Sequence, residues 1–83
     1  MFLHLGADLV VPLRDVIGIH DLKAANSKVN NEFIRLMKNS KKVIDISDNS
    51  PKSFIITDHR VYLSPISSIT LKKRASNMIE LEE

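Results

Sequence analysis

The sequence of 83 residues contains no cysteine and no tryptophan, and it has only two glycines and one tyrosine. Without cysteine, neither a disulfide nor a thiolate-bound metal can supplement the core. The two glycines, Gly6 and Gly18, are too far apart to form a phosphate-binding loop. Because Tyr62 is the single tyrosine, the aromatic platform on which single-stranded nucleic acids stack is also missing.

A targeting segment and a long apolar run are absent as well. Residues 1–8 lack the basic start of a signal peptide and reach an acidic residue, Asp8, too early for one. No apolar run approaches the roughly 20 residues that a membrane span needs. We therefore expect a cytoplasmic protein that has no membrane partner.

The residue types that carry chemistry do not form a recognisable catalytic pattern. His4, His20 and His59 show none of the spacings of metal-binding histidines, and we predict that each lies at the surface. No serine, threonine or lysine has the framework of an activated nucleophile around it. We predict that the protein is not an enzyme and has no catalytic residue, metal site or cofactor.

The charge is distributed unevenly along the chain. The net charge is only +2, but three of the last four residues are acidic, and residues 1–79 hold 12 Lys and Arg against 7 Asp and Glu. We therefore expect one domain over residues 1–75, followed by an acidic tail over residues 76–83. A moderately basic body suits a polyanionic partner.

Short apolar runs separated by turn residues predict a domain rich in β-strands. Thr57–Arg60 has the length and chemistry of a hairpin turn, and Gly18 indicates either a bulge or a close backbone approach within its strand. Because a domain of this size buries only about 60% of its unfolded surface, we expect it to form a homo-oligomer. The predicted strands cover residues 2–5, 9–11, 16–20, 43–46, 54–56 and 61–63.

Two segments have the pattern of helices. Apolar residues from Val29 to Met37 fall on one face of a helix over residues 27–40. Ser67 or Ser68 is suited to cap a short C-terminal helix, and we expect the chain beyond Ala75 to be frayed or partly helical. The predicted fold class is α+β, a small single domain with an antiparallel-rich sheet, one main helix and a short C-terminal helix.

The basic residues are the strongest candidates for a functional surface. Arg14, Lys52 and Arg60 lie in predicted turns and loops, where they are candidate contacts to DNA phosphates. Lys72, Lys73 and Arg74 form a second patch, although successive helical residues point about 100° apart. A solvated helix end explains this triplet as well as phosphate contact does.

Six blocks of the sequence, at residues 2–6, 14–19, 51–54, 57–58, 61–68 and 70–74, together span nearly the whole chain. In these blocks the chain resembles a known family, the Rem regulators of extracellular-matrix genes in spore-forming bacteria, and within it the RemB branch. The resemblance implies a small DNA-binding transcriptional regulator with a fold like that of LytTR-type domains. It also implies that subunits assemble into rings that present basic surface to duplex DNA.

The chain differs from RemA-type chains in two places where those chains carry arginine. The loop that holds an arginine pair in those chains reads Asp48–Lys52 here, and only Lys52 is positively charged. The early arginine of those chains aligns with Asp15, one position after Arg14.

Two functions are compatible with these residues. The first is a DNA-binding transcriptional regulator of matrix or biofilm genes that binds duplex DNA as a homo-oligomer, mainly through phosphate contacts. The alternative is a structural or adaptor subunit that does not bind DNA and assembles with itself or with a related Rem protein through apolar edge strands.

Overall fold

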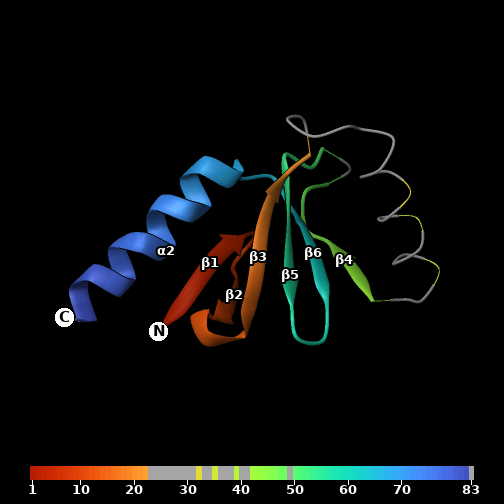
Figure 1. Ribbon diagram of the computed structural model, residues 1–83. Helices are drawn as coiled ribbons and strands as arrows, with labels where there is room; N and C mark the ends of the chain where they lie inside the picture. The colour runs from red at the N-terminus through yellow and green to blue at the C-terminus, as the bar shows by residue number, and fades with distance from the viewer. Residues whose placement is uncertain (23–31, 33–34, 36–38, 40–41, 49, 83) are drawn as a thin grey trace.

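The structure is a computed structural model that describes residues 1–22, 32, 35, 39, 42–48 and 50–82 (Figure 1). A two-stranded sheet, a four-stranded sheet and a C-terminal helix give the α+β class that the sequence predicts. The elements in chain order are β1 (Phe2–Gly6), β2 (Leu9–Pro12), the 3₁₀ turn η1 (Leu13–Asp15), β3 (Val16–Asp21), β4 (Val43–Asp45), β5 (Ser53–Thr57), β6 (Val61–Ser64) and α2 (Ser68–Glu82).

The predicted helix over residues 27–40 lies largely outside the described residues. Within that range the structure describes Glu32, Arg35 and Asn39, and all three are helical and exposed.

Strands β1 and β2 form an antiparallel hairpin around the turn Gly6–Asp8. Gly6 has a φ of 115°, and an added Cβ would stand 3.1 Å from the Pro65 ring, so the position requires glycine for two reasons. Leu3 and Leu5 are fully buried, whereas His4 between them is exposed. This alternation is the one that the sequence predicts for a strand with a single buried face.

The four-stranded sheet has the order β3-β5-β6-β4. The β5–β6 hairpin is antiparallel, as predicted, and the register of β3 on β5 shifts between Val16 and Gly18, which is a bulge, one of the two predicted alternatives. Strand β4 pairs with β6 in parallel, a pairing that the sequence analysis did not predict. Strands β3 and β4 therefore run in the same direction at opposite edges of the sheet and need a crossover connection, for which residues 22–42 are long enough.

The larger part of the core lies between one face of this sheet and the elements that cover it. Ile55 and Tyr62 are cross-strand neighbours on that face, and Leu3 and Leu5 of the hairpin pack against them together with Leu71 of α2. Phe54, Val61 and Leu63 form a second buried cluster. Figure 1 shows β1 and β2 between α2 and the four-stranded sheet. Tyr62 is thus part of the core.

Helix α2 begins at a serine cap and is longer than the sequence predicts. The hydroxyl of Ser67 accepts a hydrogen bond from the backbone N–H of Thr70 at 3.2 Å, as an N-cap does. The helix continues to Glu82, so it is not short, and the chain beyond Ala75 is helical, which is one of the two states predicted for it. Leu71, Ala75 and Met78 follow a helical spacing on its less exposed side, and this packing extends the helix past the basic triplet.

We predict that Leu71→Ala strongly destabilises the fold. The Leu71 side chain is 0% exposed and lies in the main cluster, so its removal costs transfer free energy and leaves a cavity. The expected loss is about 2–5 kcal/mol in the free energy of unfolding, measured by urea denaturation. Ile69→Ala, on the same helix at a side chain that is 64% exposed, is the control and is expected to change little. Equal losses in the two variants would contradict this account of how α2 is held.

Candidate nucleic-acid interface

The turn between β5 and β6 is held rigidly by its first and last residues. The backbone N–H of Thr57 donates to the carbonyl of Arg60 at 2.8 Å. The Thr57 hydroxyl accepts from the N–H of Arg60 at 3.1 Å and donates to its carbonyl at 3.0 Å. Thr57 is buried, while Asp58, His59 and Arg60 are exposed. The turn therefore presents three charged or titratable side chains from a fixed backbone.

The 3₁₀ turn η1 is attached to this hairpin turn by a backbone hydrogen bond. The N–H of Asp58 donates to the carbonyl of Asp15 at 3.2 Å, which brings the neighbouring Arg14 to the same end of the molecule. The Arg14 side chain is 89% exposed. We refer to Arg14, Asp15, Asp58, His59 and Arg60 together as the turn end.

The charges of the turn end balance one another while His59 is neutral. Arg14 lies 4.0 Å from the carboxylate of its neighbour Asp15, and His59 lies 3.5 Å from that of Asp58. These are the two pairs found at the turn end among the described residues, and Arg60 takes part in neither. These pairs are exposed to solvent, so each is weak, but the aspartates reduce the attraction of this surface for a phosphate.

A cleft of about 270 Å³ lies between strand β2 and the turn end. Its apolar lining includes the buried side chains of Val11 and Tyr62, and its charged lining comes from the turn end. The lining residues are Val10, Val11, Pro12, Asp15, Thr57, Asp58, His59, Arg60 and Tyr62.

Lys52 is separated from the turn end by the whole length of β5. It precedes the first residue of that strand, whereas Arg60 closes the turn after its last residue. Five residues of extended strand correspond to about 17 Å. The three cations that the sequence analysis grouped as phosphate contacts, Arg14, Lys52 and Arg60, therefore do not share one surface within a protomer. Their binding to phosphate stays a prediction.

The basic triplet of α2, which we call the helix cluster, lies on the exposed side of that helix. Lys72, Lys73 and Arg74 are all exposed because Leu71 and Ala75 take the side that faces the core. A guanidinium nitrogen of Arg74 donates to the backbone carbonyl of His4 at 3.4 Å. Among the residues that the structure describes, no carboxylate forms an ion pair with this cluster.

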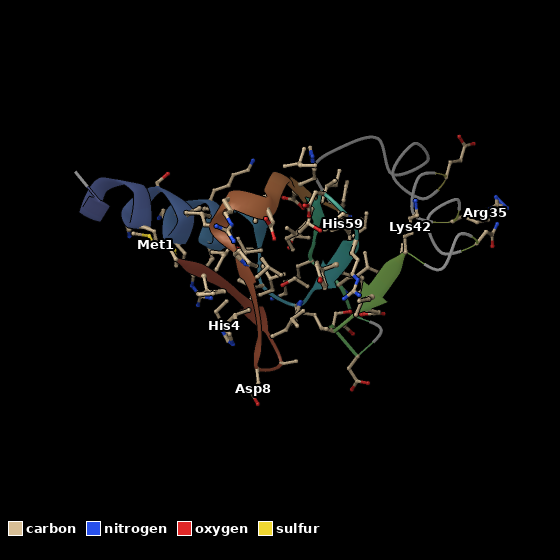
Figure 2. All side chains as sticks on the ribbon, turned by 90° about the horizontal axis from the view of Figure 1, so that it is seen from below. Met1, His4, Asp8, Arg35, Lys42 and His59 are labelled. Atoms are coloured by element: carbon tan, nitrogen blue, oxygen red, sulfur yellow. The ribbon has the colours of Figure 1, made fainter. Side chains whose placement is uncertain are left out.

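The three histidines lie on separate elements and do not form a common site. His4 is exposed on β1, His20 stacks on Phe54 with 4.9 Å between ring centroids, and His59 lies in the turn end. In Figure 2, the labelled His4 and His59 lie on separate elements. The described residues contain no group of three or more side chains that could hold a metal ion, and no described helix is long and apolar enough to cross a membrane.

The role of the aspartates at the turn end was missed in the sequence analysis. Asp15 and Asp58 are next in sequence to Arg14 and His59, respectively, which was the available signal. Their importance depends on the contact between η1 and the hairpin turn, two segments that are more than 40 residues apart in sequence.

Comparison with known proteins gives two matches. The profile of the RemA-like family, described as extracellular matrix regulatory protein A-like, matches residues 2–75. Extracellular matrix regulatory protein B of Bacillus subtilis (strain 168) is 45% identical over 82 residues, which cover 99% of each of the two chains.

We predict that Thr57→Val loosens the hairpin turn and destabilises the protein. Valine keeps the branched shape but removes the hydroxyl that bonds to both backbone groups of Arg60. The Arg60 carbonyl keeps its bond from the backbone N–H of Thr57, but the partly buried N–H of Arg60 loses its partner, and we expect a loss of about 1 kcal/mol. Urea denaturation of the variant tests this loss, and Thr57→Ser, which retains the hydroxyl, is expected to remain closer to the wild-type protein. The prediction fails if serine and valine destabilise equally.

Proposed function

The chain belongs to the RemA-like family of extracellular matrix regulatory proteins, and we propose that it regulates matrix genes by binding duplex DNA as a homo-oligomer. The family and the name of its relative support a role in matrix regulation. The finer statement, that the protein contacts DNA phosphates, is our proposal and is argued from the distribution of charge on the surface.

The helix cluster is the observation that carries this proposal. Three consecutive cations are exposed on one helix, without an acidic partner among the described residues. An unpaired cation keeps its full attraction for a phosphate, and its binding releases counterions from DNA. Lys72, Lys73 and Arg74 are therefore proposed as the principal phosphate contacts. Arg14 is proposed as a weaker contact because Asp15 partly neutralises it, and Arg60, which forms no ion pair among the described residues, is proposed as a further single contact.

The separation of the basic surfaces favours an oligomer as the DNA-binding species. Lys52 and the turn end lie at opposite ends of β5, so no single surface of one protomer contains all the candidate cations. Repeating each weak surface in a closed assembly, such as a ring, would let several of them act on one duplex. A LytTR-like mode of binding is likewise part of the proposal.

Exposed apolar side chains support self-association. Phe2 is 60% exposed, and Val10 and Met1 are about half exposed, all on or beside the β1–β2 hairpin. Phe2 pairs with Pro12, and His4 pairs with Val10, across the outer face of that hairpin. We propose that a second copy of the chain covers this face, because a domain of this size gains stability from association.

The same face supports the alternative function as an adaptor. If the hairpin contacts a related Rem protein, the chain would act as a subunit of a mixed assembly without binding DNA. A DNA-binding protein shows a steep dependence of affinity on salt, whereas an adaptor forms an oligomer whose size depends on concentration and is indifferent to DNA. In either case we propose a regulatory, non-enzymatic role in the cytoplasm.

The first test of the proposal removes two charges from the helix cluster. We predict that Lys72→Ala with Lys73→Ala lowers affinity for a labelled duplex of about 30 base pairs at least about tenfold at physiological salt. The slope of log affinity against log salt should fall by about 0.9 for each phosphate contact that is lost. Fluorescence anisotropy over a salt series measures both quantities.

A matched control removes two charges elsewhere. Arg35 and Lys42 are exposed and lie on the side of the molecule opposite α2 (Figure 2), so Arg35→Ala with Lys42→Ala should change the affinity little. Equal losses in the two double variants would mean that only net charge matters. Absence of binding at low salt by a folded wild-type oligomer, checked by light scattering, would reject DNA binding and favour the adaptor.

A further inference from the structure

The cleft between β2 and the turn end is continuous with the exposed apolar face of the β1–β2 hairpin. Val10 and Pro12 line the cleft and also lie on that face, where Pro12 is the cross-strand partner of Phe2. We propose that the Phe2 side chain of a second copy of the chain occupies this cleft, in a reciprocal contact between two copies. The inference rests on the proposed self-association and adds to it the receiving site and the charges that orient the partner.

The cleft has the lining that an apolar side chain needs. Its volume is about 270 Å³, and Val11 and Tyr62, both largely buried, form part of its apolar lining. An aromatic side chain buries a large apolar area when it enters such a cleft, and aromatic residues are common anchors of protein interfaces. The cleft therefore suits one aromatic side chain of a protein partner.

Phe2 is available for this contact. Among the Phe and Tyr residues that the structure describes, Phe2 is 60% exposed, whereas Phe54 and Tyr62 are buried. The backbone around Phe2 is held on both sides, because the carbonyl of Met1 accepts a hydrogen bond from the N–H of Leu13 at 2.9 Å and Phe2 pairs with Pro12. A side chain on a fixed strand loses little freedom when it binds.

Phe2 and the cleft lie on the same side of one chain, so the contact is reciprocal. Figure 1 shows α2, then the β1–β2 hairpin, then the turn that joins β5 to β6, and the cleft lies between β2 and that turn. A twofold axis near β2 exchanges the two halves of this series. The Phe2 side chain of each copy then enters the cleft of the other, and α2 of each copy faces the turn end of the other.

The charges at the two ends of this series are complementary. The guanidinium of Arg74 on α2 lies beside β1 through its 3.4 Å hydrogen bond to the His4 carbonyl, and it has no ion pair among the described residues. At the other end, Asp58 lines the cleft and its side chain is 50% exposed. The twofold contact brings Arg74 toward Asp58 of the second copy. Because Arg60 lines the same cleft, this pairing fixes the orientation of the partner and does not depend on net charge.

The first test shortens the side chain that enters the cleft. Phe2→Ser should raise the protein concentration at half association at least about tenfold, measured by sedimentation velocity over a concentration series without DNA. Ile69→Ser, at a side chain of α2 that is 64% exposed, removes a similar apolar group elsewhere and should associate as the wild type does. Circular dichroism checks that the compared proteins are folded.

The second test reverses the charges of the proposed pair. Asp58→Arg and Arg74→Asp should each weaken association, because each variant places two like charges against one another in both halves of the contact. An equimolar mixture of the two variants should associate again, because each pair across the twofold axis then joins opposite charges. Mixing cannot repair a misfolded variant, so recovery is specific to the contact.

The outcomes separate this contact from the function on which it rests. Association that is unchanged in Phe2→Ser, or that does not recover in the mixture, would overturn the contact and leave the proposed oligomer to form through another surface. A wild-type protein that stays monomeric at every concentration would overturn both the contact and the homo-oligomer. None of these variants alters Lys72 or Lys73, so the proposed contact with DNA is tested separately.

Discussion

The packing of the β1–β2 hairpin and α2 onto one face of the four-stranded sheet is the interaction on which the rest of this structure depends. A two-stranded hairpin has little stability of its own in water, and α2 has only one apolar side to bury. Both are held by the Ile55 and Tyr62 face of the sheet. A buried hydrogen bond of 2.6 Å from the Ser64 hydroxyl to the Leu5 carbonyl also joins β6 to β1 across 59 positions of sequence.

This packing decides which cations are presented to a ligand and how strongly each can act. Leu71 and Ala75 turn toward the core, so the three basic residues between them point outward from α2. At the turn end, the contact of η1 with the hairpin turn brings Arg14 and its partner Asp15 to the same end of the molecule as Asp58, His59 and Arg60. Among the described residues, the helix cluster is therefore a basic surface without an ion pair, whereas the turn end carries acidic and basic side chains together.

Small size links the association proposed for this protein to the binding proposed for it. A single copy would offer few phosphate contacts, and each exposed contact would be weakened by salt. The proposed assembly would repeat those contacts on a rigid body and at the same time cover the exposed apolar side chains of the hairpin. For the proposed regulator, the same association that stabilises the fold would also supply the avidity for DNA.

The features that could be predicted from the sequence are those set by neighbouring residues. The apolar run at residues 2–5 identified a strand, Thr57–Arg60 a hairpin turn, Gly18 a bulge or a close backbone approach, and the serines at 67 and 68 a helix start, because strand propensity, turn chemistry and capping act over a few residues. The candidate cations could be identified by type. Their grouping on the surface could not be predicted, since Lys52 and Arg60 lie close in sequence but are held apart by an extended strand.

The parallel pairing of β4 with β6, the full length of α2 and the bond from Asp58 to Asp15 depend on contacts between distant segments. Only tertiary packing selects those contacts, because no local pattern specifies which distant surface will cover an apolar face or which acid will come to stand beside a base.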